Sequence, residues 1–398
     1  MNFTKTKDWI IQYIYILGVA LYIAYYYLYL SYIWHVENQP VQVINWKLLF
    51  YGSLICFLIK IVLTKYKWYE LIVIVATAVL MYVCWKHSGG IDYPVNCLII
   101  FGMKNVDLRK VIKVVLFSSL LAICYGMTWT FLNMPDTIAV VKDYGRGMVE
   151  TRFRFCIWNA NALNLLCLTI MLCFLYLYCE KCKWWVYFIV LFLYYHLFLL
   201  TKSRTSFFAG VIGIIMFLGL RYGRKIFQSK LIMALYVVIN FLLILTPLIL
   251  VFFNAHIPKL YIKVNQMLTG RLDVAQRCVT EGGIHLFGSN MGGKVCGYGI
   301  YTQSTPGYVT ELGSVRTFLE YGHIVFILFL VFILFAIFVL HRSGDYAAVI
   351  MLTIALTAFS FEAYFPAAYN MKAFILGFAF FKLKELNFHR KRNNELKQ

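Results

Sequence analysis

Residues 184–220 read WWVYFIVLFLYYHLFLLTKSRTSFFAGVIGIIMFLGL, two apolar runs joined by the polar turn TKSRTS at residues 201–206. Each run has the length and apolar content of a helix that crosses the hydrocarbon core of a bilayer. Neither run shows the polar face, at helical period, of a surface helix in a soluble protein. The stretch therefore predicts two membrane-spanning helices with a tight turn between them.

The composition extends this prediction to the whole chain. Of its 398 residues, 62% are hydrophobic and 14% are charged, whereas soluble domains average about 25% charged residues. Apolar runs recur from end to end, so we predict an all-α polytopic membrane protein that forms a single integral membrane domain over residues 1–398. About twelve spans are expected, near residues 9–32, 47–63, 69–85, 92–103, 112–132, 158–178, 184–200, 206–220, 231–253, 322–340, 346–364 and 369–381.

The fourth of these segments, residues 92–103, differs from the others because it is short and contains Pro94 and Asn96. Non-helical or broken backbone at membrane depth is tolerated only where protein surrounds it. This segment is therefore expected to be a half-helix buried in the protein rather than a full span.

The basic residues orient the chain in the membrane. With the N-terminus inside, the predicted inner segments contain Lys65, Lys67, Lys104, Arg109, Lys110, Lys113, Lys181, Lys183, Arg221, Arg224, Lys225, Lys230, Arg342 and a basic tail at residues 382–398. Positively charged loops are retained on the cytoplasmic side, so both termini are predicted to be cytoplasmic. Two long segments then face outward, residues 133–157 and, between the ninth and tenth spans, residues 254–321.

The net charge of +20 does not by itself indicate a nucleic-acid partner, and none is expected. The cations lie in short loops between spans, where they orient the protein and contact the headgroups of membrane lipids. The single Cys-x-x-Cys pair, Cys179 and Cys182, has no second pair with which to complete a zinc site. Neither a metal nor a cofactor is therefore expected.

Several arginines fall in the predicted outer segments, against the usual distribution of cations. They are Arg204 in the turn at residues 201–206, Arg146, Arg152 and Arg154 before the sixth span, and Arg271, Arg277 and Arg316 in the large loop. A guanidinium matches the oxygens of a diphosphate and stays charged near lipid. The alternative for each is a solvated cation or a headgroup anchor, but the turn that carries Arg204 is too short to hold it far from the bilayer.

Two kinds of polar neighbour leave their roles open. An outer acid such as Glu311 is a candidate general base for a sugar hydroxyl, whereas an acid beside an arginine more often forms an ion pair. Glu320 follows Arg316 by four residues, which places the two on one helical face. Asn159 and Asn161 open the sixth span, where they either cap the helix or bind sugar hydroxyls.

These residues resemble motifs of the bacterial O-antigen and capsular polysaccharide polymerases (Wzy-type), which are related to the O-antigen ligases. RFRFCIWNAN at residues 152–161 resembles the family's Arg…Gly-Phe-x-His-Pro-Asn entry to a span, with Cys156, Asn159 and Ala160 in place of Gly, His and Pro. SRTS at residues 203–206 is similar to the family's Ser-Arg-Thr/Ser turn. Residues 270–271 with residues 284–288 resemble its Gly-Arg…Leu-x-Gly segment, and ELGSVRTFLEYG at residues 311–322 resembles the segment that leads into the next span.

The resemblance implies a polymerase that joins undecaprenyl-diphosphate-linked oligosaccharide repeats into a surface polysaccharide at the outer face of the bacterial plasma membrane. A hydroxyl of one repeat would attack the anomeric carbon of another, and undecaprenyl diphosphate would leave. Arg204, Arg271 and Glu311 are the expected catalytic residues; Arg152, Arg154, Asn159, Asn161, Arg277 and Arg316 are the expected substrate-binding residues. A chain-length regulator and a flippase of the same pathway are candidate protein partners.

Two other activities remain alternatives, besides the role of a non-catalytic membrane subunit of an assembly complex. One is a ligase that transfers finished glycan to another acceptor, although ligases carry a His where this chain has Glu311. The other is a flippase or another transporter, which would be expected to have ionisable residues within its spans. The middles of the predicted spans are nearly uncharged, with His196 as the main exception, and this favours the polymerase.

Overall fold

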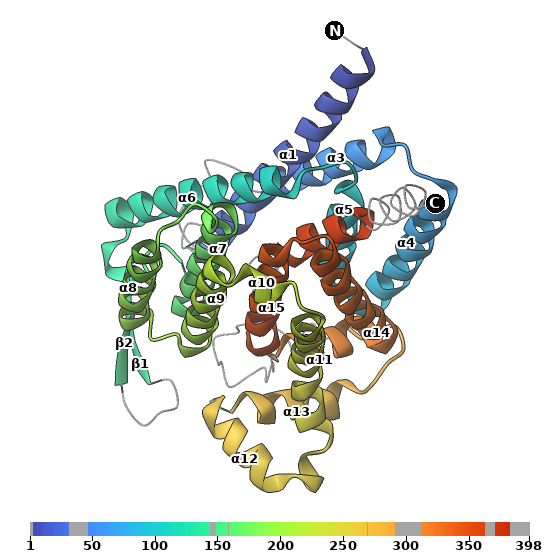
Figure 1. Cartoon of the computed structure of the whole chain (residues 1–398). Coiled ribbons are helices and arrows are strands. Elements are labelled where there is room, and N and C mark those ends of the chain that lie inside the picture. Colours follow the sequence, from blue (N-terminus) through green and yellow to red (C-terminus); the bar gives the residue numbers. More distant parts are fainter. Residues whose placement is uncertain are drawn as a thin grey trace.

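The computed structural model describes residues 3–31, 47–143, 149–157, 159–268, 270–290, 310, 312–362 and 371–382. Its helices are α1 (Phe3–Tyr29), α3 (Lys47–Leu63), α4 (Trp68–Ser88), α5 (Asp92–Gly102), α6 (Leu108–Asn133), α7 (Ala160–Tyr178), α8 (Trp184–Thr201), α9 (Arg204–Tyr222), α10 (Arg224–Phe227), α11 (Lys230–Phe252), α12 (Pro258–Met267), α13 (Arg271–Gly282), α14 (Gly313–Arg342) and α15 (Tyr346–Phe361). Residues 371–382 are also helical. Figure 1 shows these helices as one bundle.

The protein is a polytopic membrane protein built mainly from α-helices. Within the described residues, eight helices are long and apolar enough to cross a membrane: α1 from Asp8 onward, α4, α6, α7, α8, α9, α11 and α14. Each of the twelve predicted segments coincides with a helix, but α3, α5, α15 and residues 371–382 form shorter helices. The predicted half-helix at residues 92–103 corresponds to α5, of 11 residues.

Both predicted outer loops contain regular structure. The first contains a short 3-10 turn, η1 (Pro135–Thr137), and an antiparallel hairpin of β1 (Ala139–Asp143) and β2 (Val149–Phe153), in which Val141 pairs with Thr151. This hairpin departs from the predicted all-α class. The second contains η2 (Asn254–His256), α12, α13 and the first turns of α14.

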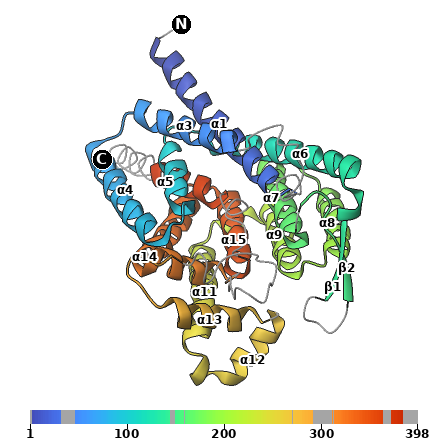
Figure 2. The same ribbon diagram turned by 180° about the vertical axis from the view of Figure 1, so that it is seen from behind.

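Helix α7 lies at the centre of one half of the bundle, because it packs against α6, α8, α9 and α15. It is apolar on nearly every side, as a helix surrounded by other helices must be. Helices α4 and α5 lie on the other side of the bundle, and α11, α14 and α15 lie between the two halves (Figures 1 and 2). The packing places α14 against α4, α11 and α15.

The helices give the bundle two ends, which we name from the charge-based prediction. The outer end contains the hairpin, α12 and α13, together with the N-termini of α5, α7, α9 and α14 and the C-termini of α8, α11 and α15. The inner end contains the connections at residues 64–67, 103–107, 179–183, 223–229 and 343–345. The basic tail predicted at residues 382–398 lies outside the described residues except for Lys382.

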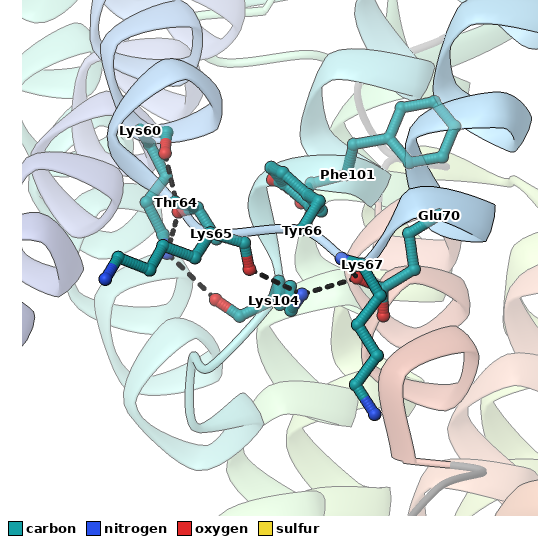
Figure 3. A network of polar contacts seen from close by, with 8 residues as sticks. All are labelled: Lys60, Thr64, Lys65, Tyr66, Lys67, Glu70, Phe101 and Lys104. Atoms are coloured by element: carbon teal, nitrogen blue, oxygen red, sulfur yellow. Dashed lines mark hydrogen bonds and ion pairs between the residues drawn. The ribbon is translucent and has the colours of Figure 1, made fainter.

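Two inner-end turns are joined by a polar network, shown in Figure 3. The Lys104 ammonium forms an ion pair with the buried carboxylate of Glu70 and donates to the Lys65 carbonyl. The buried Lys60 ammonium donates to the Lys104 carbonyl oxygen at 2.8 Å and to Thr64 Oγ1 at 2.9 Å. The network therefore ties the turn between α3 and α4 to the turn between α5 and α6.

Replacing Lys104 by methionine should destabilise the protein strongly. The substitution leaves the Glu70 carboxylate, which is 2% exposed, without its cation, and breaking a buried ion pair on one side costs about 3–5 kcal/mol. The matched control is Lys67→Met, which removes an exposed lysine from the turn between α3 and α4, beside the same network. Thermal unfolding of both variants in detergent measures the difference; equal melting temperatures would show that the pair contributes little.

Candidate functional site

The turn that carries Arg204 joins α8 to α9 at the outer end. Lys202 closes α8 in the left-handed conformation (φ 55°), and Ser203 is the N-cap residue of α9. Arg204 is the first helical residue of α9, and its side chain is exposed. Within the described parts of the chain it forms no hydrogen bond or ion pair with a side chain or carbonyl group. Among the described residues, no carboxylate pairs with this cation at the N-terminus of α9, which is the positive end of the helix dipole.

A buried polar network holds this turn in place. Asn164 of α7 is fully buried, and its Nδ2 donates to Thr201 Oγ1 at 2.9 Å. The Tyr194 hydroxyl lies 2.7 Å from Asn164 Oδ1 and 2.9 Å from the Ser206 carbonyl oxygen. Gly210 makes room for the tyrosine ring, because a Cβ there would lie 2.2 Å from a ring carbon. Sequence reasoning missed Asn164 and Tyr194, although an asparagine inside an apolar run was a usable signal.

The arginines of the hairpin are held by neighbouring groups. Arg152 is 4% exposed, and its guanidinium contacts Glu150 Oε2 at 2.8 and 3.0 Å. Arg154 donates to the Thr137 carbonyl oxygen at 2.7 Å. Asn159 is the N-cap residue of α7, where its side chain accepts from the backbone N–H of Asn161 at 2.8 Å. The Oδ1 atom of Asn159 thus caps the helix.

Arg271 occupies the start of α13 and forms an ion pair that the sequence analysis missed. Its Nη2 lies 2.9 Å from Glu362 Oε1, and its Nη1 donates to the Phe361 carbonyl oxygen at 2.6 Å. Glu362 follows the last residue of α15 and is 2% exposed. Arg277 is exposed on α13. Glu311, the expected general base, lies outside the described residues.

Two glycines let the large outer segment cross itself closely. The helical conformation of α14 is interrupted at Gly322 (φ 82°), so residues 313–321 form a separate helical piece. A Cβ on Gly322 would lie 2.3 Å from the Leu286 carbonyl oxygen, and one on Gly288 would lie 2.0 Å from that of Glu320. Ser289 N also donates to the Leu319 carbonyl oxygen at 3.1 Å. A side chain at either glycine would force the backbone near residues 286–288 away from the backbone near residues 320–322.

The helical piece at residues 313–321 presents a charged cluster. Arg316 Nε donates to Glu320 Oε2 at 2.7 Å, as their spacing predicted. Both line a small cavity of about 30 Å³ together with Asp92 of α5 and Lys372. Lys372 is 5% exposed, and its ammonium lies 3.8 Å from the centre of the Phe359 ring. We name Asp92, Arg316, Glu320 and Lys372 the outer charged cluster.

An apolar cavity of about 260 Å³ adjoins the outer charged cluster. It is lined by α4, α5, α14 and the helix at residues 371–382, and it shares Tyr93, Asn96 and Lys372 with the small polar cavity. Its other lining residues include Leu80, Leu328, Phe329, Phe332 and Leu376. An apolar cavity that borders charged groups has the chemistry to hold an amphipathic lipid.

Three charged residues near the ends of predicted spans are buried, unlike His196. His196 is exposed on α8, whereas Lys60, Glu362 and Lys372, which also fall within predicted spans, are buried. A cation in an apolar run is itself a signal of function or of a buried partner. This signal was available in the sequence for Lys372 and was overlooked.

The structure brings most of the candidate residues to one end of the bundle without joining them. Helix α9 packs against α15, with Gly213 facing Ile354, so Arg204 and Glu362 lie at similar heights at the outer ends of these helices. In the described part of the chain, Arg271 contacts Glu362 and Phe361, and Arg204 forms no hydrogen bond or ion pair with either of them. Nor do the described His, Cys, Asp and Glu residues form a group of three or more that could hold a metal ion.

Comparison with known proteins found no match: no family model, no curated protein and no solved structure corresponds to this chain.

The Tyr194 hydroxyl should be required to hold the turn at residues 201–206. In Tyr194→Phe the buried Asn164 Oδ1 and Ser206 carbonyl lose their shared donor, which should cost about 1–3 kcal/mol. Tyr195→Phe is the matched control, because it removes a hydroxyl from an exposed neighbour on the same helix. Thermal unfolding in detergent should show a lower melting temperature for Tyr194→Phe than for the control, and equal values would contradict the role given to the network.

Proposed function

We propose that this chain is a polysaccharide polymerase of the bacterial plasma membrane that joins undecaprenyl-diphosphate-linked oligosaccharide repeats at the outer face. The proposal rests chiefly on Arg204, a cation at a helix N-terminus that has no carboxylate partner within the described residues. Such a position favours a bound phosphate, since both the guanidinium and the first N–H groups of the helix can donate hydrogen bonds to its oxygens. The motif resemblance at residues 203–206 supports the same residue.

The reaction requires stabilisation of negative charge. A sugar hydroxyl of one repeat attacks the anomeric carbon of another, the bond from that carbon to the diphosphate oxygen breaks, and the hydroxyl proton passes to a base. The leaving diphosphate gains negative charge at a low-dielectric boundary, where fixed cations lower the barrier. Because the diphosphate is already an activated leaving group, the mechanism uses no nucleotide sugar.

The other arginines differ from Arg204 because each has a bound partner. Arg271 is paired with Glu362, and Arg316 is paired with Glu320. A diphosphate that approached Arg271 would compete with a buried carboxylate, so we assign Arg271 to assist Arg204 and to position the end of α15. Glu311 remains the proposed base, and Arg152, Arg154, Asn159, Asn161, Arg277 and Arg316 remain proposed contacts to the substrate.

The apolar cavity beside the outer charged cluster supports a lipid-linked substrate. Its lining residues are apolar apart from Thr77, Asn96 and Lys372 and the hydroxyl group of Tyr93. A polyprenyl chain buries well against such a wall, and Lys372 lies where the apolar and charged regions meet. The small polar cavity has a volume of about 30 Å³, which is too small for a diphosphate. The outer charged cluster must therefore open or rearrange for a diphosphate to bind there.

Arg204→Ala should shorten the surface glycan severely. Losing one charge-assisted contact to the transition state costs about 3 kcal/mol, or about a hundredfold in rate. The control is Arg342→Ala, which removes an exposed arginine at the inner end. Each variant is expressed in a host from which this gene has been deleted, and the chain lengths of surface and lipid-linked glycan are measured at matched protein levels.

The deletion host also separates the alternatives. Single repeats that survive on lipid at the outer face support the polymerase, long chains that remain on lipid indicate a ligase, and single repeats trapped at the inner face indicate a flippase. Normal chain lengths with Arg204→Ala would remove Arg204 from the mechanism. Full activity of Glu311→Gln would show that Glu311 is not the base.

A substitution at Arg271 needs a compensating change, because it removes the cation that pairs with the buried Glu362 carboxylate. Arg271→Met should lower both the melting temperature and the activity, and the double variant Arg271→Met with Glu362→Gln should recover the stability. If Arg271 assists the reaction, the double variant remains defective in glycan length. Recovery of full-length glycan would show that Arg271 serves only the fold.

A further inference from the structure

A third cavity, about 540 Å³ in volume, lies at the inner end of the bundle. Its walls come from the N-terminal part of α6, the C-terminal ends of α7, α9 and the helix at residues 371–382, the start of α10, and the turn between α14 and α15. Six charged side chains line it: Arg109, Glu180, Arg221, Arg224, Asp345 and Lys382. Helix α7 has 19 residues and, at 1.5 Å per residue, separates this cavity from the outer end by about 28 Å.

The two carboxylates of this inner cavity already have partners. Glu180 lies 2.9 Å from Arg224 and 4.0 Å from Arg109, so it holds two arginines of different helices beside each other. Asp345 accepts from the Ala348 N–H at the start of α15 and from the Tyr176 hydroxyl. Neither carboxylate is within ion-pair distance of Arg221 or Lys382.

The charges of the inner cavity therefore do not cancel. Arg221 and Lys382 have no carboxylate within ion-pair distance in the described part of the chain, and each contacts an aromatic ring of its own helix, Tyr222 and Phe378 respectively. Among the described residues that line the cavity, four cations face two carboxylates, which leaves two excess positive charges. Positive loops alone would place cations on an open surface, whereas these converge on a concave space.

We propose that the inner cavity binds a phosphate-bearing anion. One guanidinium group can donate two parallel hydrogen bonds to two oxygens of a phosphate. Basic pockets between helices at the cytoplasmic side of a membrane bind anionic lipid headgroups. The volume is within the usual range for a ligand pocket, about 300–1,000 Å³. This site is independent of the proposed polymerase site, because it lies at the opposite ends of the same helices.

The phosphate can belong to a lipid headgroup or to a soluble molecule, and two measurements distinguish these sources. In the first, protein in a neutral detergent is titrated with sodium pyrophosphate by calorimetry. In the second, protein from nanodiscs of phosphatidylglycerol and phosphatidylcholine is examined by native mass spectrometry for retained phosphatidylglycerol. The test variant is the double substitution Arg221→Gln and Lys382→Gln.

The matched control is the double substitution Arg342→Gln and Lys225→Gln, which removes one arginine and one lysine at the inner end outside the cavity lining. We expect the wild type and the control to bind in at least one measurement and the test variant to bind about tenfold more weakly or not at all. Binding in the first measurement assigns a soluble phosphate, and retention in the second assigns a lipid.

The proposal is overturned if the wild type binds neither probe, or if the test variant and the control bind equally. Matching melting temperatures of the two double variants exclude unfolding as the cause of a loss. If the test double variant is unstable, the single substitutions Arg221→Gln and Lys382→Gln are compared with Arg342→Gln and Lys225→Gln in the same measurements. Glycan chain length is a separate readout, so failure here does not affect the polymerase proposal.

Discussion

The pairing of buried charge is the constraint on which the rest of this structure depends. A charged side chain removed from water must find a partner of opposite charge or a set of hydrogen bonds, because its desolvation otherwise costs several kcal/mol. Arg271 meets this demand with Glu362 at the outer end, and Lys104 meets it with Glu70 at the inner end. Each pair joins segments that are far apart in the chain, so pairing also fixes how the helices meet.

Polar groups inside the bundle obey the same rule and position the candidate site. Asn164, Tyr194 and the Ser206 carbonyl satisfy one another beneath the turn at residues 201–206, which leaves Arg204 exposed on a rigid support. At the other side of the outer end, Gly288 and Gly322 allow two stretches of backbone to touch, and this contact holds the helical piece that carries Arg316. The two ends of the bundle thus present different groups. The outer end has the candidate arginines and the outer charged cluster beside an apolar cavity, and the inner end has a basic cavity.

The sequence predicted the helices better than the segments between them. An apolar run such as residues 184–200 must become a helix in lipid, because only a helix satisfies its own backbone there, and α8 covers the same stretch. The hairpin and α13 lie between the spans, where water also satisfies the backbone, so hydropathy carried no information about them. Arg316 and Glu320 were paired correctly from their helical spacing, a local relation that needs no knowledge of the fold.

The sequence by itself determined that this chain is a helical membrane protein and which residues carry charge near the ends of its spans. Only the tertiary structure decided which of those charges meet: Arg271 with Glu362, Asp92 and Lys372 beside Arg316, and four cations around one inner cavity. The physical reason is that the hydrophobic effect and backbone hydrogen bonding act along each segment and are readable from local composition. A contact between charges depends instead on how separate helices pack, and that information is spread over the whole chain.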